Sequence, residues 1–205
     1  MADKISISEE DGKILVKTAR KIVTEYLSSG KKIELGEKFL KSFSFNSGIF
    51  VTLNNQSGLR GCIGHPLPDK KLFEALEDAA IAAATQDPRF SPVKFNELNS
   101  IKFEVTILTP PTKIEVNEPK EYLSCIQIGR DGLIVKSGYS SGLLLPQVPI
   151  EYGWNEQEFL EYTCEKAGLP KEIWETREIE IYKFEGIVFK EKEPNGEVIQ
   201  EKLLD

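Results

Sequence analysis

Apolar residues recur at helical spacing in three stretches of the chain. The clearest stripe runs from residue 8 to residue 29, where a serine can cap the start and Gly30 can end the helix. Similar faces run from 69 to 85 and from 155 to 167. The spacing therefore predicts three amphipathic helices, each with one face on a core.

Strands are predicted where apolar and β-branched residues cluster between turn signals. Such runs occupy 49–53, 59–64, 101–108, 125–129, 132–137, 142–145 and 178–189. Gly129-Arg130-Asp131-Gly132 predicts a hairpin, and the residues beyond about 191 are expected to form a polar tail. Hairpins mixed with helices predict an α+β fold, with a mainly antiparallel sheet flanked by helices.

Composition narrows the class of protein. The 205 residues include 26 basic and 33 acidic side chains, a net charge of −7, which argues against broad nucleic-acid binding. The acidic excess lies in the second half, so a local basic patch in the first half stays open. No apolar run reaches the roughly 18 residues of a membrane helix. Because the N-terminus also lacks an apolar signal region, we expect a cytoplasmic protein with no membrane segment.

The cysteine and histidine residues do not have the spacing of a metal-binding site. The three cysteines are widely spaced and the single histidine, His65, has no ligand cluster around it, so no metal is expected. No cofactor or oligomeric state is indicated. His65 follows Cys62 by three residues; a nucleophilic Cys/His pair and a surface turn histidine both fit that spacing.

The segment Leu59–Gly64, called the signature here, combines a guanidinium, a thiol and two glycines. Alternation along a strand puts its first, third and fifth residues toward the core, and Arg60, Cys62 and Gly64 on the other face. An adjacent Arg lowers the pKa of a thiol and can make it a nucleophile or an anion anchor. The alternative is that Cys62 is a small buried hydrophobic residue.

Two further places carry candidate chemistry. Asp87 and Arg89 flank a proline in a loop, where Arg89 could hold a phosphate or carboxylate, or the two could form a local pair that pins the loop. Gln147 stands at the end of an apolar run, where it is either a site residue or a partner for nearby backbone.

Several segments together resemble the AMMECR-one domain family. The main ones are Leu59–Gly64, Asp87–Phe90, Ile128–Leu133 and Gly142–Val148. The six-residue signature and the Gly142–Val148 segment are highly specific, and the resemblance extends from the first helix to about Phe189. The family has no established reaction, so the resemblance implies a fold and leaves the activity open.

The fold that the resemblance implies has two unequal domains with a cleft between them, lined by the signature. Residues 1–45 and 113–205 would form the larger α+β domain, and 46–112 a smaller β-β-α-β domain. The main hypothesis is a small anionic or nucleotide-like ligand in that cleft. Cys62 and Asp87 are the candidate catalytic residues, and the candidate ligand-binding residues are Arg60, Gly61, Gly64, Arg89 and Gln147. The alternative is a non-catalytic module that binds a partner protein or a nucleic acid.

Overall fold

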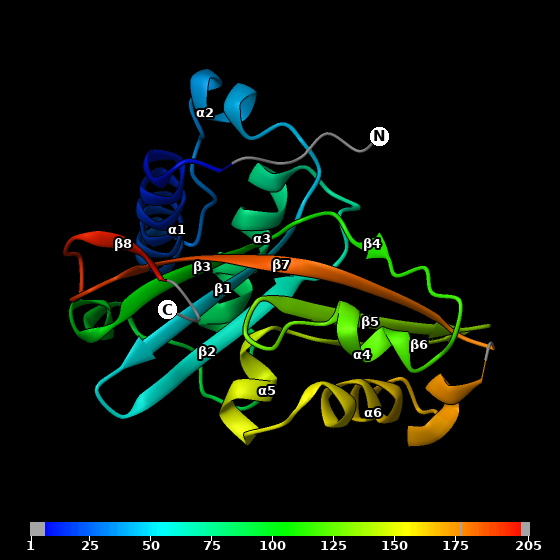
Figure 1. The fold of residues 1–205 in the computed structure, drawn as a ribbon. Helices are drawn as coiled ribbons and strands as arrows, with labels where there is room; N and C mark the ends of the chain where they lie inside the picture. The colour runs from blue at the N-terminus through cyan, green and yellow to red at the C-terminus, as the bar shows by residue number, and fades with distance from the viewer. Residues whose placement is uncertain (1–6, 177, 202–205) are drawn as a thin grey trace. The chain divides into compact units, whose positions relative to one another are not determined.

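The computed structural model describes residues 7–176 and 178–201, and the chain divides into two compact units. Unit 1 contains the chain up to Leu108 together with Ile187–Glu201, and unit 2 contains Thr109–Gly186. Both units combine helices with antiparallel strands, which confirms the α+β class (Figure 1). No helix in the described ranges is long and apolar enough to cross a membrane.

The sheet of unit 1 has β1 (Gly48–Asn55) between two antiparallel neighbours, β2 (Gly58–His65) and β3 (Lys102–Leu108). β2 is the edge strand. The chain end adds β8 (Val198–Glu201), which pairs with the last residues of β7 (Glu180–Glu191). The predicted polar tail is therefore wrong for residues up to 201, because Val198 is buried and its strand closes a hairpin, while 202–205 lie outside the described residues.

Helices cover one face of this sheet. α1 (Glu9–Ser29) packs on α3 (Leu72–Thr85), and both contact the strands below them (Figure 1). A short helix α2 (Glu37–Ser42) and the 3-10 turn η1 (Phe95–Ser100) complete the unit. The first helix therefore belongs with the strands of the predicted smaller domain, a division that differs from the one expected from the sequence.

Local caps explain the predicted helix boundaries. The Ser8 hydroxyl accepts a hydrogen bond from the Asp11 amide at 3.1 Å, and the Asp11 carboxylate accepts from the Ser8 amide, so both ends of this capping box are present. Gly30 ends α1 with φ 71°, a left-handed conformation that glycine adopts readily. An equivalent box begins α6 (Glu156–Lys166) at Asn155.

In unit 2, β5 (Asp131–Ser137) pairs with both β6 (Ser140–Leu144) and the first residues of β7. The other elements are β4 (Thr112–Lys113), α4 (Glu121–Cys125), α5 (Gln147–Tyr152), α6 and η2 (Lys171–Glu175). Phe159, Leu160 and Trp174 are buried in its core.

Two predictions for unit 2 are wrong. Residues 125–129 form the end of α4 and a turn instead of a strand, and the hairpin lies around Gly138, between β5 and β6. The cause is Asp131, whose buried carboxylate accepts a hydrogen bond from the Gln127 amide at 2.9 Å and so closes the turn before β5.

Candidate functional site

The signature strand contains a β-bulge at Arg60. The β1–β2 register pairs Leu53 with Gly61 and Asn54 with Leu59, which leaves Arg60 as the extra residue on β2. A bulge interrupts the strict alternation assumed for the whole segment. Leu59, expected in the core, is accordingly 40% exposed.

Arg60 is engaged by the chain itself. Its Nε and Nη2 donate to the two carboxylate oxygens of Glu97, at 3.0 and 3.3 Å, and Nη1 donates to the Ser91 carbonyl at 2.8 Å. The same pairing lowers the pKa of Glu97. These contacts hold η1 and the loop before it against the edge strand.

Asp87 and Arg89 complete the open edge of β2. The Cys62 amide donates to Asp87 Oδ2 at 2.8 Å, and Arg89 Nη2 donates to the Cys62 carbonyl at 3.3 Å. An edge strand otherwise leaves such groups unpaired. The loop therefore pairs with the backbone N–H and C=O of Cys62, as a neighbouring strand would.

The Asp87 carboxylate is buried and fully occupied. Arg89 Nε and Nη2 donate to it at 2.9 and 2.7 Å, and the amides of Cys62 and Arg89 donate as well. The Arg89 guanidinium and these hydrogen bonds hold the pKa of Asp87 well below its usual range. Asp87 is therefore a fixed anion at neutral pH, and Arg89 remains half exposed beside it.

Cys62 lies on the sheet face opposite the helices, because the neighbouring Gly61 faces α3. Thr52 Oγ1 donates to the Cys62 sulfur at 3.2 Å. Burial raises the pKa of the Cys62 thiol, against the opposing effects of the Thr52 hydrogen bond and the Arg89 charge. The thiol is therefore protonated at neutral pH, and the cation that acts on it is Arg89.

Glu104 is the site residue that sequence reasoning missed. Thr52 pairs with Cys62 on one side and with Glu104 on the other, so the three side chains form one row across β2, β1 and β3, called the polar row here. Burial, with the added charge of Glu201, raises the pKa of Glu104 to about 7. Only the pairing register of strands far apart in the sequence places Glu104 beside Thr52 and Cys62. The pattern of residues within β3 does not reveal it.

Both signature glycines allow close packing. A Cβ on Gly61 would lie 2.1 Å from the carbonyl oxygen of Ala83 in α3, and one on Gly64 would lie 2.3 Å from the Ile49 carbonyl oxygen. The absence of a side chain at Gly61 is thus what lets α3 rest on β2.

Gln147 lies apart from this cluster in sequence, as the first residue of α5 in unit 2. Its Oε1 is buried and has no hydrogen-bond partner among the described residues. His65 ends β2 and is half-buried. Within residues 7–176 and 178–201, no group of three His, Cys, Asp or Glu side chains could hold a metal ion.

Comparison with known proteins agrees with the sequence resemblance. The AMMECR1 family model matches residues 16–189. Protein MJ0810 of Methanocaldococcus jannaschii is 53% identical over 197 residues, which cover 95% of this chain and 97% of that protein. Protein MK0488 of Methanopyrus kandleri is 50% identical and covers 100% of this chain and 99% of its own length. The crystal structure of uncharacterized protein PH0010 from Pyrococcus horikoshii is similar with a TM-score of 0.86 at 47% identity, over 96% of this chain and 98% of that one.

Proposed function

Because this chain belongs to the AMMECR1 family, we propose that its signature strand forms a site for acid–base chemistry on a small anionic ligand. The relatives named above carry no assigned reaction in their names. The observation that carries the proposal is Glu104, a carboxyl group with a pKa of about 7 in the same cross-strand row as Cys62. Strongly shifted carboxyl groups of this kind gather at catalytic sites.

Glu104 has the property that proton transfer requires. A group whose pKa lies near the working pH is present in both protonation states, so it can accept and donate a proton in one cycle. Thr52 separates it from Cys62, and two strand spacings put the backbones of the outer residues about 10 Å apart. A small ligand above Thr52 would therefore reach both side chains.

Cys62 serves this site as a neutral contact. Its raised pKa leaves too little thiolate at neutral pH for a nucleophile. The thiol already accepts a hydrogen bond from Thr52 and keeps its own weak donor for a ligand. This assignment replaces the activated thiolate considered from the sequence with a binding group.

Arg89 supports the choice of an anion. Its side chain is 54% exposed, although Nε and Nη2 are engaged by Asp87. A guanidinium with free N–H donors recognises carboxylate and phosphate oxygens. Since Asp87 already offsets much of the Arg89 charge, a singly charged ligand suits the position better than a polyanion.

Carboxyl-carbon NMR over a pH series tests the proton-transfer group. We expect one glutamate to titrate with a midpoint near pH 7, and Glu104→Gln to remove that signal. A titration midpoint near pH 4.5 for Glu104 would contradict the proton-transfer role and favour the alternative of a non-catalytic binding module. That result needs no knowledge of the substrate.

Amide NMR with inorganic phosphate and acetate as probes tests the ligand class. We expect shifts at Cys62 and Arg89, lost in Arg89→Gln. Arg130→Gln is the matched control, because Arg130 forms the same kind of pair with a buried aspartate, Asp131, at 2.7 Å. Equal losses in the two variants would count against an anion site at Arg89.

A further inference from the structure

A groove on unit 1 lies away from the polar row, between α1, η1 and the turn at Asn195. Its volume is about 580 Å³, within the range of small-molecule sites. The side chains that concern its chemistry are Lys17, Lys21, Phe95, Asn96, Asn99 and Asn195. It shares no residue with the site proposed above.

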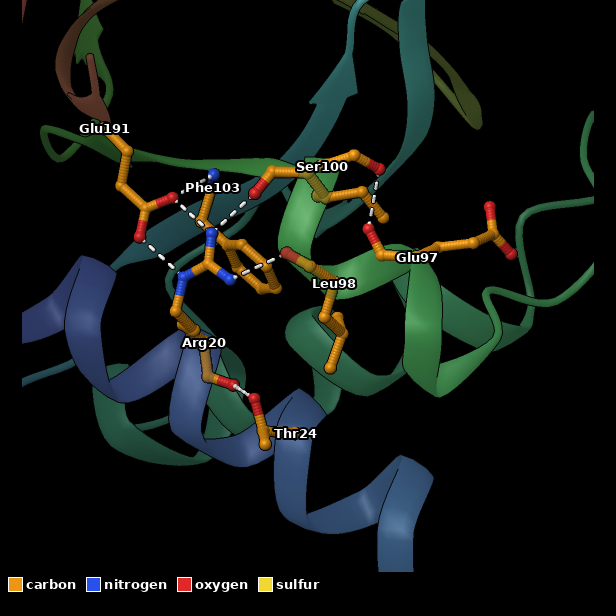
Figure 2. Close-up of polar contacts among 8 residues, drawn as sticks. Arg20, Thr24, Glu97, Leu98, Ser100, Phe103 and Glu191 are labelled. Carbon is orange, nitrogen blue, oxygen red and sulfur yellow. Dashed lines mark hydrogen bonds and ion pairs between the residues drawn. The ribbon is translucent and has the colours of Figure 1, made fainter. Parts of the chain in front are cut away.

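Arg20 lines the groove, and its guanidinium is held by a carboxylate and two backbone carbonyls. Its Nε and Nη2 donate to the two oxygens of Glu191 at 2.6 and 2.5 Å, Nη2 also donates to the Ile101 carbonyl, and Nη1 donates to the Leu98 carbonyl (Figure 2). The guanidinium also lies 4.5 Å from the centre of the Phe103 ring. Arg20 therefore gives the groove a rigid, charge-balanced base and leaves ligand binding to the rim.

The rim of the groove carries positive charge that is free to bind a ligand. Lys17 and Lys21 are exposed and lie one turn apart on α1, so their ammonium groups share one face. Neither has an ion-pair partner among residues 7–176 and 178–201. Glu25 is the carboxylate on this rim, which leaves a net positive edge on a chain whose total charge is −7.

The opposite side offers amides and an aromatic face. Asn96 and Asn99 project from η1, and Asn195 is held at the turn by a left-handed backbone with φ 58°. Each amide supplies donors and an acceptor. Phe95 is 53% exposed and lines the groove, so part of its ring surface is available for stacking.

We propose that this groove binds a small ligand with a phosphate group and a planar ring, the class of nucleoside monophosphates. The phosphate lies against Lys17 and Lys21, where two ammonium groups form charge-assisted hydrogen bonds with its oxygens. The ring stacks on Phe95, and the amides contact its polar edge. A bare phosphate would use only the lysines, and a bare nucleoside only the ring and amides.

Amide NMR of the full chain at low salt, with adenosine monophosphate, adenosine and inorganic phosphate as separate probes, tests the proposal. We expect adenosine monophosphate to bind at least about tenfold more tightly than either partial probe, with shifts at residues 17, 21, 95 and 99. Lys17→Gln with Lys21→Gln should weaken it by about tenfold or more and leave adenosine binding unchanged. Phe95→Ala should weaken adenosine monophosphate and leave phosphate binding unchanged.

The matched control is Lys31→Gln with Lys38→Gln, which removes the same charge from two exposed lysines outside the groove. Wild-type affinity in the control, with loss in the groove variant, supports the proposal. Equal loss in both variants, equal affinity for inorganic phosphate and adenosine monophosphate, or no shifts at the groove each overturn it. The shifts at residues 17, 21, 95 and 99 are read separately from those at Cys62 and Arg89, so this inference and the proposed function fail separately.

Discussion

Glu104 makes the stability of the protein depend on pH in an unusual direction. Its pKa in the folded chain is about 7, above the ordinary value of 4.5. The folded state therefore favours the protonated form, and the cost of ionising Glu104 in place grows as the pH rises from the unfolded to the folded pKa. Most carboxylates in ion pairs act in the opposite sense.

Glu104→Gln should therefore stabilise the protein in alkaline solution. At pH values above about 8 we expect a gain in the free energy of unfolding of up to about 3 kcal/mol, because the pKa is raised by about two units or more. Below about pH 4 wild type and variant should be equal. Urea unfolding at both pH values measures this, with exposed Glu34→Gln as control. A gain that is the same at both pH values would show that the charge of Glu104 is not its cause.

Asp87→Asn should lower the stability of the protein, in contrast to Glu104→Gln. The variant loses the anion that Arg89 and the Cys62 amide contact, and we expect about 2–3 kcal/mol less stability at neutral pH. Because the pKa of Asp87 is lowered in the folded state, its contribution is present above the ordinary value near 4 and lost as the pH falls through the folded pKa. The difference from wild type should therefore shrink in acid. Asp69→Asn, at an exposed position, should show neither effect in the same denaturation series.

Individual residues show where sequence reasoning stops. The Asp87/Arg89 pair was foreseeable, since the two residues flank one proline and local contacts depend on few torsions. The engagement of Arg60 by Glu97 was not, because a bulge redirects the side chain and Glu97 is 37 positions away. Glu104 required the register of three strands, which sequence spacing does not encode.

At the scale of elements, β2 depends on contacts at both its edge and its face. The Asp87–Arg89 loop pairs with its open edge, and α3 rests directly on Gly61. The signature is thus bound to its surroundings by backbone as much as by side chains. The packing of α3 on β2 leaves no room for a side chain at position 61.

Gly61→Ala should separate α3 from β2. The added methyl would meet the backbone carbonyl of Ala83 at 2.1 Å, and backbone cannot move as a side-chain tip can, so we expect a loss of about 1–3 kcal/mol. Gly36→Ala is the control, since nothing lies within 4 Å of a Cβ there. Thermal unfolding of both variants measures the contrast; a Gly61→Ala protein that melts with wild type would contradict the close approach.

Element boundaries were predictable where the signals were local. Capping residues fixed the ends of α1 and α6 because each cap bonds to residues three or four positions away. β8 was missed because four residues of modest hydrophobicity become a strand only when β7 lies beside them. Tertiary pairing overrides local propensity for such short segments.

At the scale of the whole molecule, the main feature is that unit 1 is built from two separate segments, the chain up to Leu108 and Ile187–Glu201. Residues 187–201 return to it after unit 2 and bring Phe189, Val198 and Glu191 into its interior. Glu191 also accepts a hydrogen bond from the Phe103 amide at 3.0 Å (Figure 2). The return segment therefore carries both core and charge.

Glu191→Ala should destabilise unit 1 strongly. Arg20 would stay buried without its carboxylate, and removing one partner of a buried ion pair costs about 3–5 kcal/mol. Glu193→Ala, two positions further on and exposed, should remain near wild type. Urea unfolding of the two variants checks the difference. Similar curves for both would falsify the role of Glu191 as the counterion that unit 1 requires.

The pairing of Arg20 with Glu191 can form only late in synthesis of the chain. The two residues are 171 positions apart, so at 5–20 residues per second the ribosome takes roughly 10–30 s to supply the second after the first. The stretch Thr109–Gly186 of unit 2 lies between the two residues and is therefore synthesised within that interval. Until Glu191 follows, the Arg20 guanidinium lacks its carboxylate partner, although residues 109–186 have already been synthesised.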